Sequence, residues 1–162
     1  MTGKDWVEQQ TEILEIKASR IERDEERIRK LESEIYGITA IVYDRDRVQT
    51  SCDGDVLGRK YAEMNELYEI NTKRIDDYAR YRNRVIDKID TFIPNQDLAA
   101  VIKDRHVFFM SNVQIADELG ITDRAVKKRF FKAYDLLNSI YVLEKYRKKI
   151  KGVDSSPQKV VI

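Results

Sequence analysis

The sequence predicts an all-α protein in which a long antiparallel, coiled-coil-like helical hairpin is followed by a compact helix-turn-helix domain. Three observations support this. The chain of 162 residues has only two prolines and six glycines, and 36% of its residues are charged, which is typical of long solvated helices. Apolar residues recur at heptad spacing in the first half. In the second half, Gly120 stands between two short segments that each have one apolar face.

The first predicted helix begins near Val7 and is about 50 Å long. An apolar residue returns at every seventh position: Val7, Leu14, Ile21, Ile28 and Ile35. The positions three residues later are apolar only toward the carboxyl end: Gln10, Lys17, Asp24, Leu31 and Ile38. This half-formed second stripe suits packing against another helix of the same chain better than a free-standing parallel coiled coil.

The stretch from about residue 40 to 56 breaks this period, and we expect it to be an ordered connection. The segment 43–55 collects residues that favour turns and helix caps. Its aspartates lack the closing bidentate glutamate of a calcium loop, so a calcium site is rejected. Capping of the next helix by Ser51, Asp53 or Asp55 is a sufficient structural role.

A second heptad pattern predicts the other arm of the hairpin. Its positions are Leu57, Tyr61, Met64, Tyr68, Asn71, Ile75, Tyr78, Arg82, Val85, Ile89 and Phe92. An antiparallel arrangement that brings Ile38 near Leu57 would place Asp24 level with Asn71, where two polar residues would set the register. Alternatively, both are solvated interruptions at the edge of the stripe.

Pro94 is expected to end this helix, because the residue before a proline is disfavoured in the helical region, and Asn95 is expected to cap the next one. The sequence therefore predicts three parts. Residues 1–93 form the hairpin and oligomerisation region, residues 94–151 form the compact domain, and residues 152–162 form a flexible tail.

The segment 112–126 has the residue pattern of a helix-turn-helix. Ser111 or Asn112 caps a helix whose inward residues are Ile115, Ala116 and Leu119. Small Ala116 permits a close helix crossing, and Gly120 supplies the positive φ of the corner. Ile121 fills the angle between the helices, Thr122 caps the second helix and Val126 is its first inward residue.

The second helix, expected over residues 122–138, would place its amino-terminal part in the major groove of DNA. Arg124, Lys127 and Lys128 are the candidates for contacts with base edges, beside Asp123 on the same outward face. Asn112, Thr122 and Lys132 are the candidates for phosphate contacts. The competing interpretation is that these are ordinary solvated charges on a helical hairpin.

The charge distribution favours the first interpretation. Residues 122–151 hold ten Lys or Arg and three acidic residues, a local net charge of +7, so that the rest of the chain carries −6 of the total of +1. A basic working end and an acidic scaffold are typical of proteins that bind nucleic acid.

Other functions lack support. No nucleophile–base pair, phosphate-binding loop or metal-ligand cluster is apparent, so no catalytic residue, metal or cofactor is expected. The lone His106 is expected to be a partly buried structural residue. The lone Cys52, the absence of a long apolar run and an amino terminus unlike a signal peptide favour a cytoplasmic protein without membrane association.

Two segments carry a resemblance to known families. Asp117-Glu-Leu-Gly-Ile-Thr-Asp-Arg-Ala-Val-Lys-Lys-Arg-Phe-Phe-Lys-Ala-Tyr-Asp-Leu-Leu resembles region 4 of the bacterial sigma-70 class, which recognises promoter DNA through a helix-turn-helix. Together with Asp46-Arg-Val-Gln-Thr-Ser-Cys-Asp-Gly-Asp55, it makes the chain similar to the ArpU/RinA-type late-gene regulators of phages and prophages of Gram-positive hosts. Cys52 stands where such proteins often have proline. Arg129 stands where simpler repressors have an apolar residue.

The resemblance implies sequence-specific binding of double-stranded promoter or operator DNA by a transcription regulator, with host RNA polymerase as a further candidate partner. A homodimer is expected, because exposed tyrosines and incomplete hairpin seams leave apolar surface to cover. Two alternatives stay open. A small terminase-like DNA-packaging protein would form a ring and show weak sequence preference, and a helical adaptor would not bind DNA at all.

Overall fold

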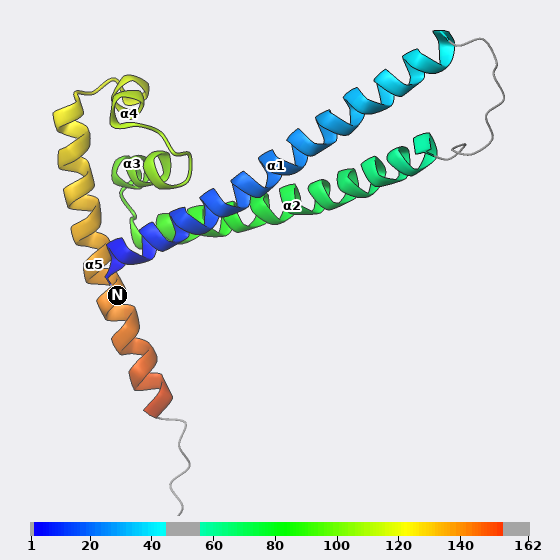
Figure 1. The fold of residues 1–162 in the computed structure, drawn as a ribbon. Helices are drawn as coiled ribbons and strands as arrows, with labels where there is room; N and C mark the ends of the chain where they lie inside the picture. The colour runs from blue at the N-terminus through cyan, green and yellow to red at the C-terminus, as the bar shows by residue number, and fades with distance from the viewer. Residues whose placement is uncertain (1, 45–55, 154–162) are drawn as a thin grey trace, which may run out of the picture. The chain divides into compact units, whose positions relative to one another are not determined.

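The computed structural model describes residues 2–44 and 56–153, and it leaves the connection 45–55 and the tail 154–162 outside the described residues. The described residues form five helices and no strand: α1 (Gly3–Asp44), α2 (Val56–Phe92), α3 (Gln96–His106), α4 (Asn112–Leu119) and α5 (Asp123–Val153) (Figure 1). The predicted all-α class is therefore confirmed. The capping role expected for Ser51, Asp53 or Asp55 lies outside the described residues, and so does Cys52.

Several predicted helix ends differ from the observed ones. Residues 40–44 belong to α1 and not to the connection, because Ala40, Ile41 and Val42 continue the helix without a glycine or proline. The last helix runs to Val153, well beyond the expected end at 138, and it includes Gly152 and Val153 of the expected tail. The end of α2 at Phe92 and the cap of α3 agree with prediction: the Leu98 N–H donates to Asn95 Oδ1 at 3.2 Å.

The chain divides into two compact units, which are described separately. One unit combines Met1–Ile13 with Arg82–Ile162, and the other is Leu14–Tyr81. These units do not coincide with the expected division at residue 94, because the first turns of α1 and the last turns of α2 pack with the carboxyl-terminal helices.

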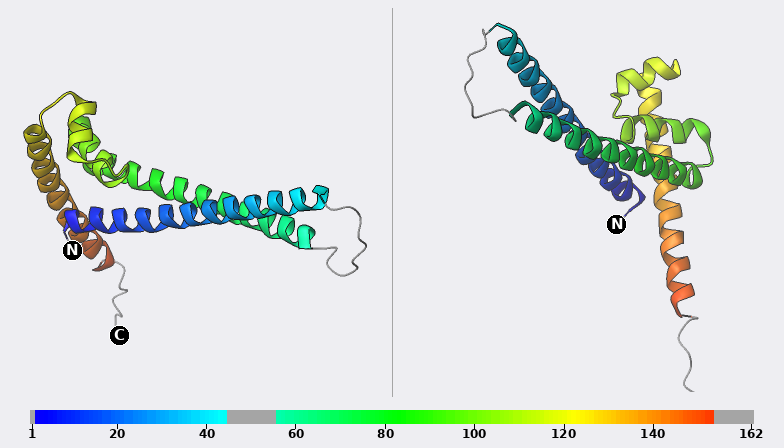
Figure 2. Two further views of the ribbon diagram at one scale, coloured as in Figure 1. Left: turned by 45° about the horizontal axis from the view of Figure 1, so that its top comes forward. Right: turned by 90° about the vertical axis from the view of Figure 1, so that its right-hand side faces the viewer.

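In the unit Leu14–Tyr81, α1 and α2 run side by side in opposite directions (Figures 1 and 2). Their apolar contact is centred on a buried cluster of Ile28, Leu31 and Leu67, with Met64 packed against it. Ion pairs join the two helices: Arg27 to Glu63 at 2.6 Å, Lys60 to Glu34, and Arg74 to Asp24. Each pair has at least one side chain that is about half exposed, although Asp24 is only 14% exposed, so the pairs contribute little to stability. They lie on both sides of the expected register.

The predicted stripe of α2 is divided between two faces of the helix. Leu67, which the pattern did not include, is buried, whereas Tyr61, Tyr68 and Ile75 are 44%, 43% and 43% exposed. Asn71 is buried and its Oδ1 accepts no hydrogen bond, so it is not a solvated interruption. Asp24 pairs with Arg74, one helical turn beyond Asn71, and not with Asn71 itself.

In the other unit, the amino-terminal turns of α1 are part of the packed core. Trp6 is buried with its ring edge-on to Phe92, the two ring centroids lying 5.6 Å apart. The Lys4 N–H donates to Asn138 Oδ1 on α5 at 3.1 Å. A Cβ placed on Gly3 would lie 2.4 Å from the carbonyl oxygen of Leu137. Only a glycine therefore allows the start of α1 to approach the backbone of α5 this closely.

His106 connects this amino-terminal segment to α5. Its Nδ1 lies 2.9 Å from Thr11 Oγ1 and its Nε2 lies 2.6 Å from the Tyr134 hydroxyl. Because Thr11 Oγ1 already donates to the Val7 carbonyl oxygen, it accepts from a protonated Nδ1, and Tyr134 donates to Nε2. Burial lowers the pKa of His106 to about 4 and raises that of Tyr134 to about 12. The imidazole is neutral and structural, as expected, and more deeply buried than predicted.

Candidate nucleic-acid interface

The corner between α4 and α5 rests on a small apolar core shared with α3. Val101, Ile115, Ala116 and Val126 are buried in it. Met110, Leu119, Ile121 and Phe130 pack against this cluster and are partly buried. The inward positions expected for Ile115, Ala116 and Val126 are confirmed, and Ile121 does lie against the core between the two helices.

The start of α4 is held by a reciprocal cap. The Gln114 N–H donates to the Ser111 hydroxyl at 3.3 Å, and the Ser111 N–H donates to the Gln114 side-chain oxygen at 2.8 Å. Ser111, and not Asn112, is therefore the capping residue. Asn112 becomes the first residue of α4 and is partly exposed.

The turn that follows α4 has the geometry expected from its glycine. Gly120 adopts φ 62° and ψ 34°, in the left-handed region. The Ile121 N–H donates to the Ala116 carbonyl oxygen at 3.0 Å, which satisfies a carbonyl at the end of α4. Thr122 then caps α5: its hydroxyl accepts from the Ala125 N–H at 3.3 Å. These bonds set the direction in which α5 leaves the corner.

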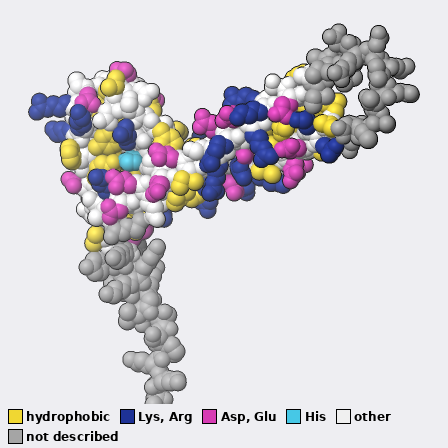
Figure 3. All heavy atoms as spheres, viewed as in Figure 1, with side chains coloured by type: hydrophobic (Ala, Val, Ile, Leu, Met, Phe, Trp, Pro, Cys, Tyr) yellow, Lys and Arg dark blue, Asp and Glu magenta, His cyan; other side chains and the backbone are white. Residues whose placement is uncertain are grey.

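The outward face of α5 carries the predicted basic residues. Arg124, Lys127, Lys128 and Lys132 are all exposed, and Thr122 is exposed at the amino end. Asp123 is half-buried and pairs with Lys127 across one turn at 2.7 Å. Lys and Arg side chains gather over the amino-terminal half of α5 (Figure 3). Arg129 lies elsewhere on the helix, where it pairs with Asp97 of α3 at 3.5 Å.

One residue of this face was not predicted. Phe131 is 73% exposed and stands one turn beyond Lys127 and Lys128. A large apolar side chain with that exposure is unusual among the charged residues of this face, which include Lys127, Lys128 and Asp135. Its exposure could have been predicted from the sequence, because residues three or four positions apart lie on the same face of a helix and Phe131 stands at this spacing from Lys127 and Lys128.

An open groove of about 410 Å³ lies beside this face. Side chains of α1, α3, α4 and α5 line it: Lys4, Arg105, Asn112, Lys127, Phe130, Phe131, Tyr134 and Asp135. It brings together two of the predicted residues, Asn112 and Lys127, and adds two cations that sequence reasoning missed. Lys4 is 130 residues from Tyr134 in the sequence, yet its Nζ lies 5.8 Å from the centre of that ring.

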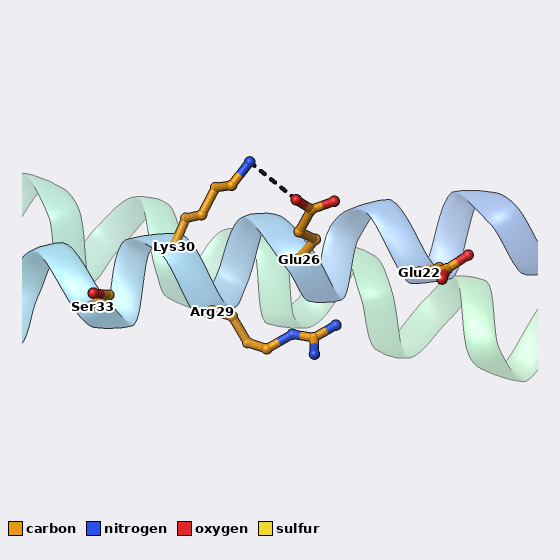
Figure 4. A pocket seen from close by; sticks show the side chains of 5 residues that line it. All are labelled: Glu22, Glu26, Arg29, Lys30 and Ser33. Carbon is orange, nitrogen blue, oxygen red and sulfur yellow. Dashed lines mark ion pairs between the residues drawn. The ribbon is translucent and has the colours of Figure 1, made fainter.

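A second depression, lined by Glu22, Glu26, Arg29, Lys30 and Ser33, lies on α1 alone. Figure 4 shows that these side chains do not converge, and the one ion pair drawn, between Lys30 and Glu26 at 3.2 Å, follows the helix surface. It is a solvated helix face. The described residues contain no group of His, Cys, Asp and Glu suited to a metal ion, and no described helix is long and apolar enough to cross a membrane.

Comparisons of the chain with protein-family models, with curated proteins and with solved structures found no match.

Proposed function

We propose that the protein binds double-stranded DNA sequence-specifically through a helix-turn-helix formed by α4 and α5. One observation carries the proposal: four exposed cations lie on the outward face of the first turns of α5, just after the Gly120 corner. A corner of this kind holds a helix end away from the rest of its domain, where it fits the width of a major groove.

The exposed residues divide into two sets by reach. Arg124, Lys127 and Lys128 lie in the first two turns, where side chains of an inserted helix reach base edges and donate to guanine. Thr122 and Lys132 lie at the edges of that face, and the partly exposed Asn112 begins α4 and lines the same groove as Lys127. These three residues suit phosphate oxygens. Asp123 orients Lys127 through their ion pair. Phe131 suits an apolar contact with a thymine methyl group or the sugar backbone.

The regulatory role follows from the resemblance to ArpU/RinA-type phage and prophage regulators and to sigma-70 region 4. On that basis we propose a cytoplasmic transcription regulator that acts as a homodimer. The charge asymmetry supports the DNA-binding part, since a local +7 attracts the phosphate backbone while an acidic remainder does not.

The test is binding of the purified full chain to tiled duplexes from its genomic neighbourhood, over a series of salt concentrations. The variant Lys127→Ala/Lys128→Ala is compared with Lys30→Ala/Lys73→Ala, which removes the same charge from exposed positions of the unit Leu14–Tyr81. We expect one tile to bind roughly a thousandfold more tightly than the others. The first variant should lose this preference and the second should keep it.

The salt series distinguishes the alternatives. If Lys127 and Lys128 contact phosphates, their removal lowers the slope of log affinity against log salt by about 0.9 for each phosphate that is no longer neutralised. Equal, weak binding to every tile would favour the terminase-like packaging protein. No salt-sensitive binding to any tile would refute DNA binding and leave the helical adaptor.

A further inference from the structure

We propose that two copies of this chain associate through α2 in an antiparallel, two-fold symmetric contact. The surface is a second seam on α2, to one side of the positions that pack against α1, although Tyr68 also reaches α1 through a hydrogen bond from its hydroxyl to Glu32. It consists of Tyr61, Asn65, Tyr68, Thr72, Ile75 and Ala79. These residues are separated by steps of four and three, the spacing of a coiled-coil seam, and all lie in the unit Leu14–Tyr81.

The second seam is unlike the rest of the surface because it carries no charge. Six consecutive seam positions over 19 residues are uncharged in a chain of which 36% is charged. Its three largest members nevertheless keep nearly half of their surface in solvent: Tyr61, Tyr68 and Ile75 are 44%, 43% and 43% exposed. Helix faces that meet only water are normally charged, so this composition indicates a partner.

The order of large and small residues indicates that the partner is the same helix in reverse. When the seam is paired with an antiparallel copy of itself, Tyr61 meets Ala79, Asn65 meets Ile75 and Tyr68 meets Thr72. Each layer then combines one large and one smaller side chain, which fills space evenly. In a parallel pair each residue would meet its own counterpart in the other copy. Tyrosine would then stack on tyrosine, and the small Thr72 and Ala79 would each face themselves.

The exposed aromatic area suits a weak dimer. Exposed parts of Tyr61 and Tyr68, together with the 76% exposed Tyr36 of α1, leave roughly 300 Å² of aromatic surface in solvent. Tyr36 belongs to the same region, since it lies one helical turn beyond Glu32, which accepts a hydrogen bond from the Tyr68 hydroxyl at 2.6 Å. A two-fold contact uses this surface twice and would bury roughly 600 Å² of aromatic area, which is in the range of weak, transient interfaces.

The second seam and the face that meets α1 point in different directions from α2. The residues of α2 that face α1, among them Leu67 and Asn71, lie about a quarter turn around the helix from Tyr61 and Thr72. Neighbouring helices in a four-helix bundle are related by this angle. Two hairpins joined through their second seams would therefore form a bundle in which each α2 contacts its own α1 and the partner's α2.

This inference extends the homodimer named under the proposed function but does not depend on DNA binding, so it is tested without DNA. Sedimentation equilibrium of the full chain should show a monomer–dimer equilibrium. Ile75→Lys places a charge in the seam and should raise the dimer dissociation constant by at least about tenfold. The matched control, Lys73→Glu on the solvated side of α2, should leave it unchanged. Circular dichroism should show equal helicity in all three proteins.

Cross-linking tests the direction. In a Cys52→Ser background, chains with Tyr61→Cys are mixed with mass-tagged chains with Ala79→Cys and oxidised. The antiparallel contact yields the mixed disulfide dimer. A parallel contact yields only dimers of like chains, because residues 61 and 79 are about 27 Å apart along the helix. A monomer at every concentration, an undisturbed dimer for Ile75→Lys, or dimers of like chains alone would each overturn the proposal.

Discussion

Acidification should destabilise the unit that holds His106, because this imidazole is neutral in the folded protein. Its pKa falls from 6.5 to about 4, first through burial and then through the positive charges of Arg105 and Lys4. Between these two pH values the unfolded chain binds one more proton than the folded one. Stability therefore rises with pH across this window and is lost as the pH falls from about 6.5 toward 4.

The size of the effect follows from the shift. A shift from 6.5 to about 4 corresponds to about 3 kcal/mol of unfolding free energy at and below pH 4, of which about 2 kcal/mol is already lost at pH 5. Protonation also breaks the network, because the Tyr134 hydroxyl now donates to Nε2, which would carry a proton. Tyr134 would have to turn its hydroxyl and find another acceptor.

The assay is urea unfolding of the wild type and of His106→Gln at a series of pH values from 7.5 to 4. Gln lacks a titrating group, whereas the carboxylates titrate in both proteins and cancel in the comparison. The stability advantage of the wild type should shrink by about 3 kcal/mol over this range. Since the chain has one histidine, its imidazole resonance gives the folded pKa directly by NMR. Parallel stability profiles, or an imidazole pKa near 6.5, would refute the reasoning.

Three glycine positions give further predictions. Gly120→Ala should cost about 1 kcal/mol of unfolding free energy, because φ is 62° and a Cβ there meets nothing within 4 Å, so the cost is purely conformational. A Cβ on Gly37 also meets nothing within 4 Å, but Gly37 has ordinary helical geometry, so Gly37→Ala should raise the unfolding free energy by about 0.5–1 kcal/mol. Urea unfolding that changed the stability of both variants in the same direction would contradict this. Gly3→Ala should displace the start of α1 from Leu137 and expose Trp6, at a cost of about 1–3 kcal/mol. The emission of Trp6, the single tryptophan, should then shift to longer wavelength, and an unchanged spectrum and stability would exclude the close approach.

Local features of the chain followed from the sequence because they depend on neighbouring residues. Pro94 and Asn95 mark the boundary between α2 and α3 through backbone sterics and a side-chain cap. Gly120 predicts the corner because only glycine adopts a positive φ at little cost. Exposure of Arg124 and Lys128 followed from the same helical period that buries Val126.

Contacts between distant segments were decided by the tertiary structure. Heptad spacing indicates which residues share a face of a helix, but not which neighbouring helix that face meets. It therefore could not predict that Leu67 of α2 is buried while Tyr61 is half-exposed. Nor does any local pattern state that the start of α1 packs with α5. His106 seemed isolated in the sequence, yet folding brings it to Thr11 and Tyr134. Helical periodicity is a property of one segment, whereas burial and hydrogen-bond partners depend on which segments meet.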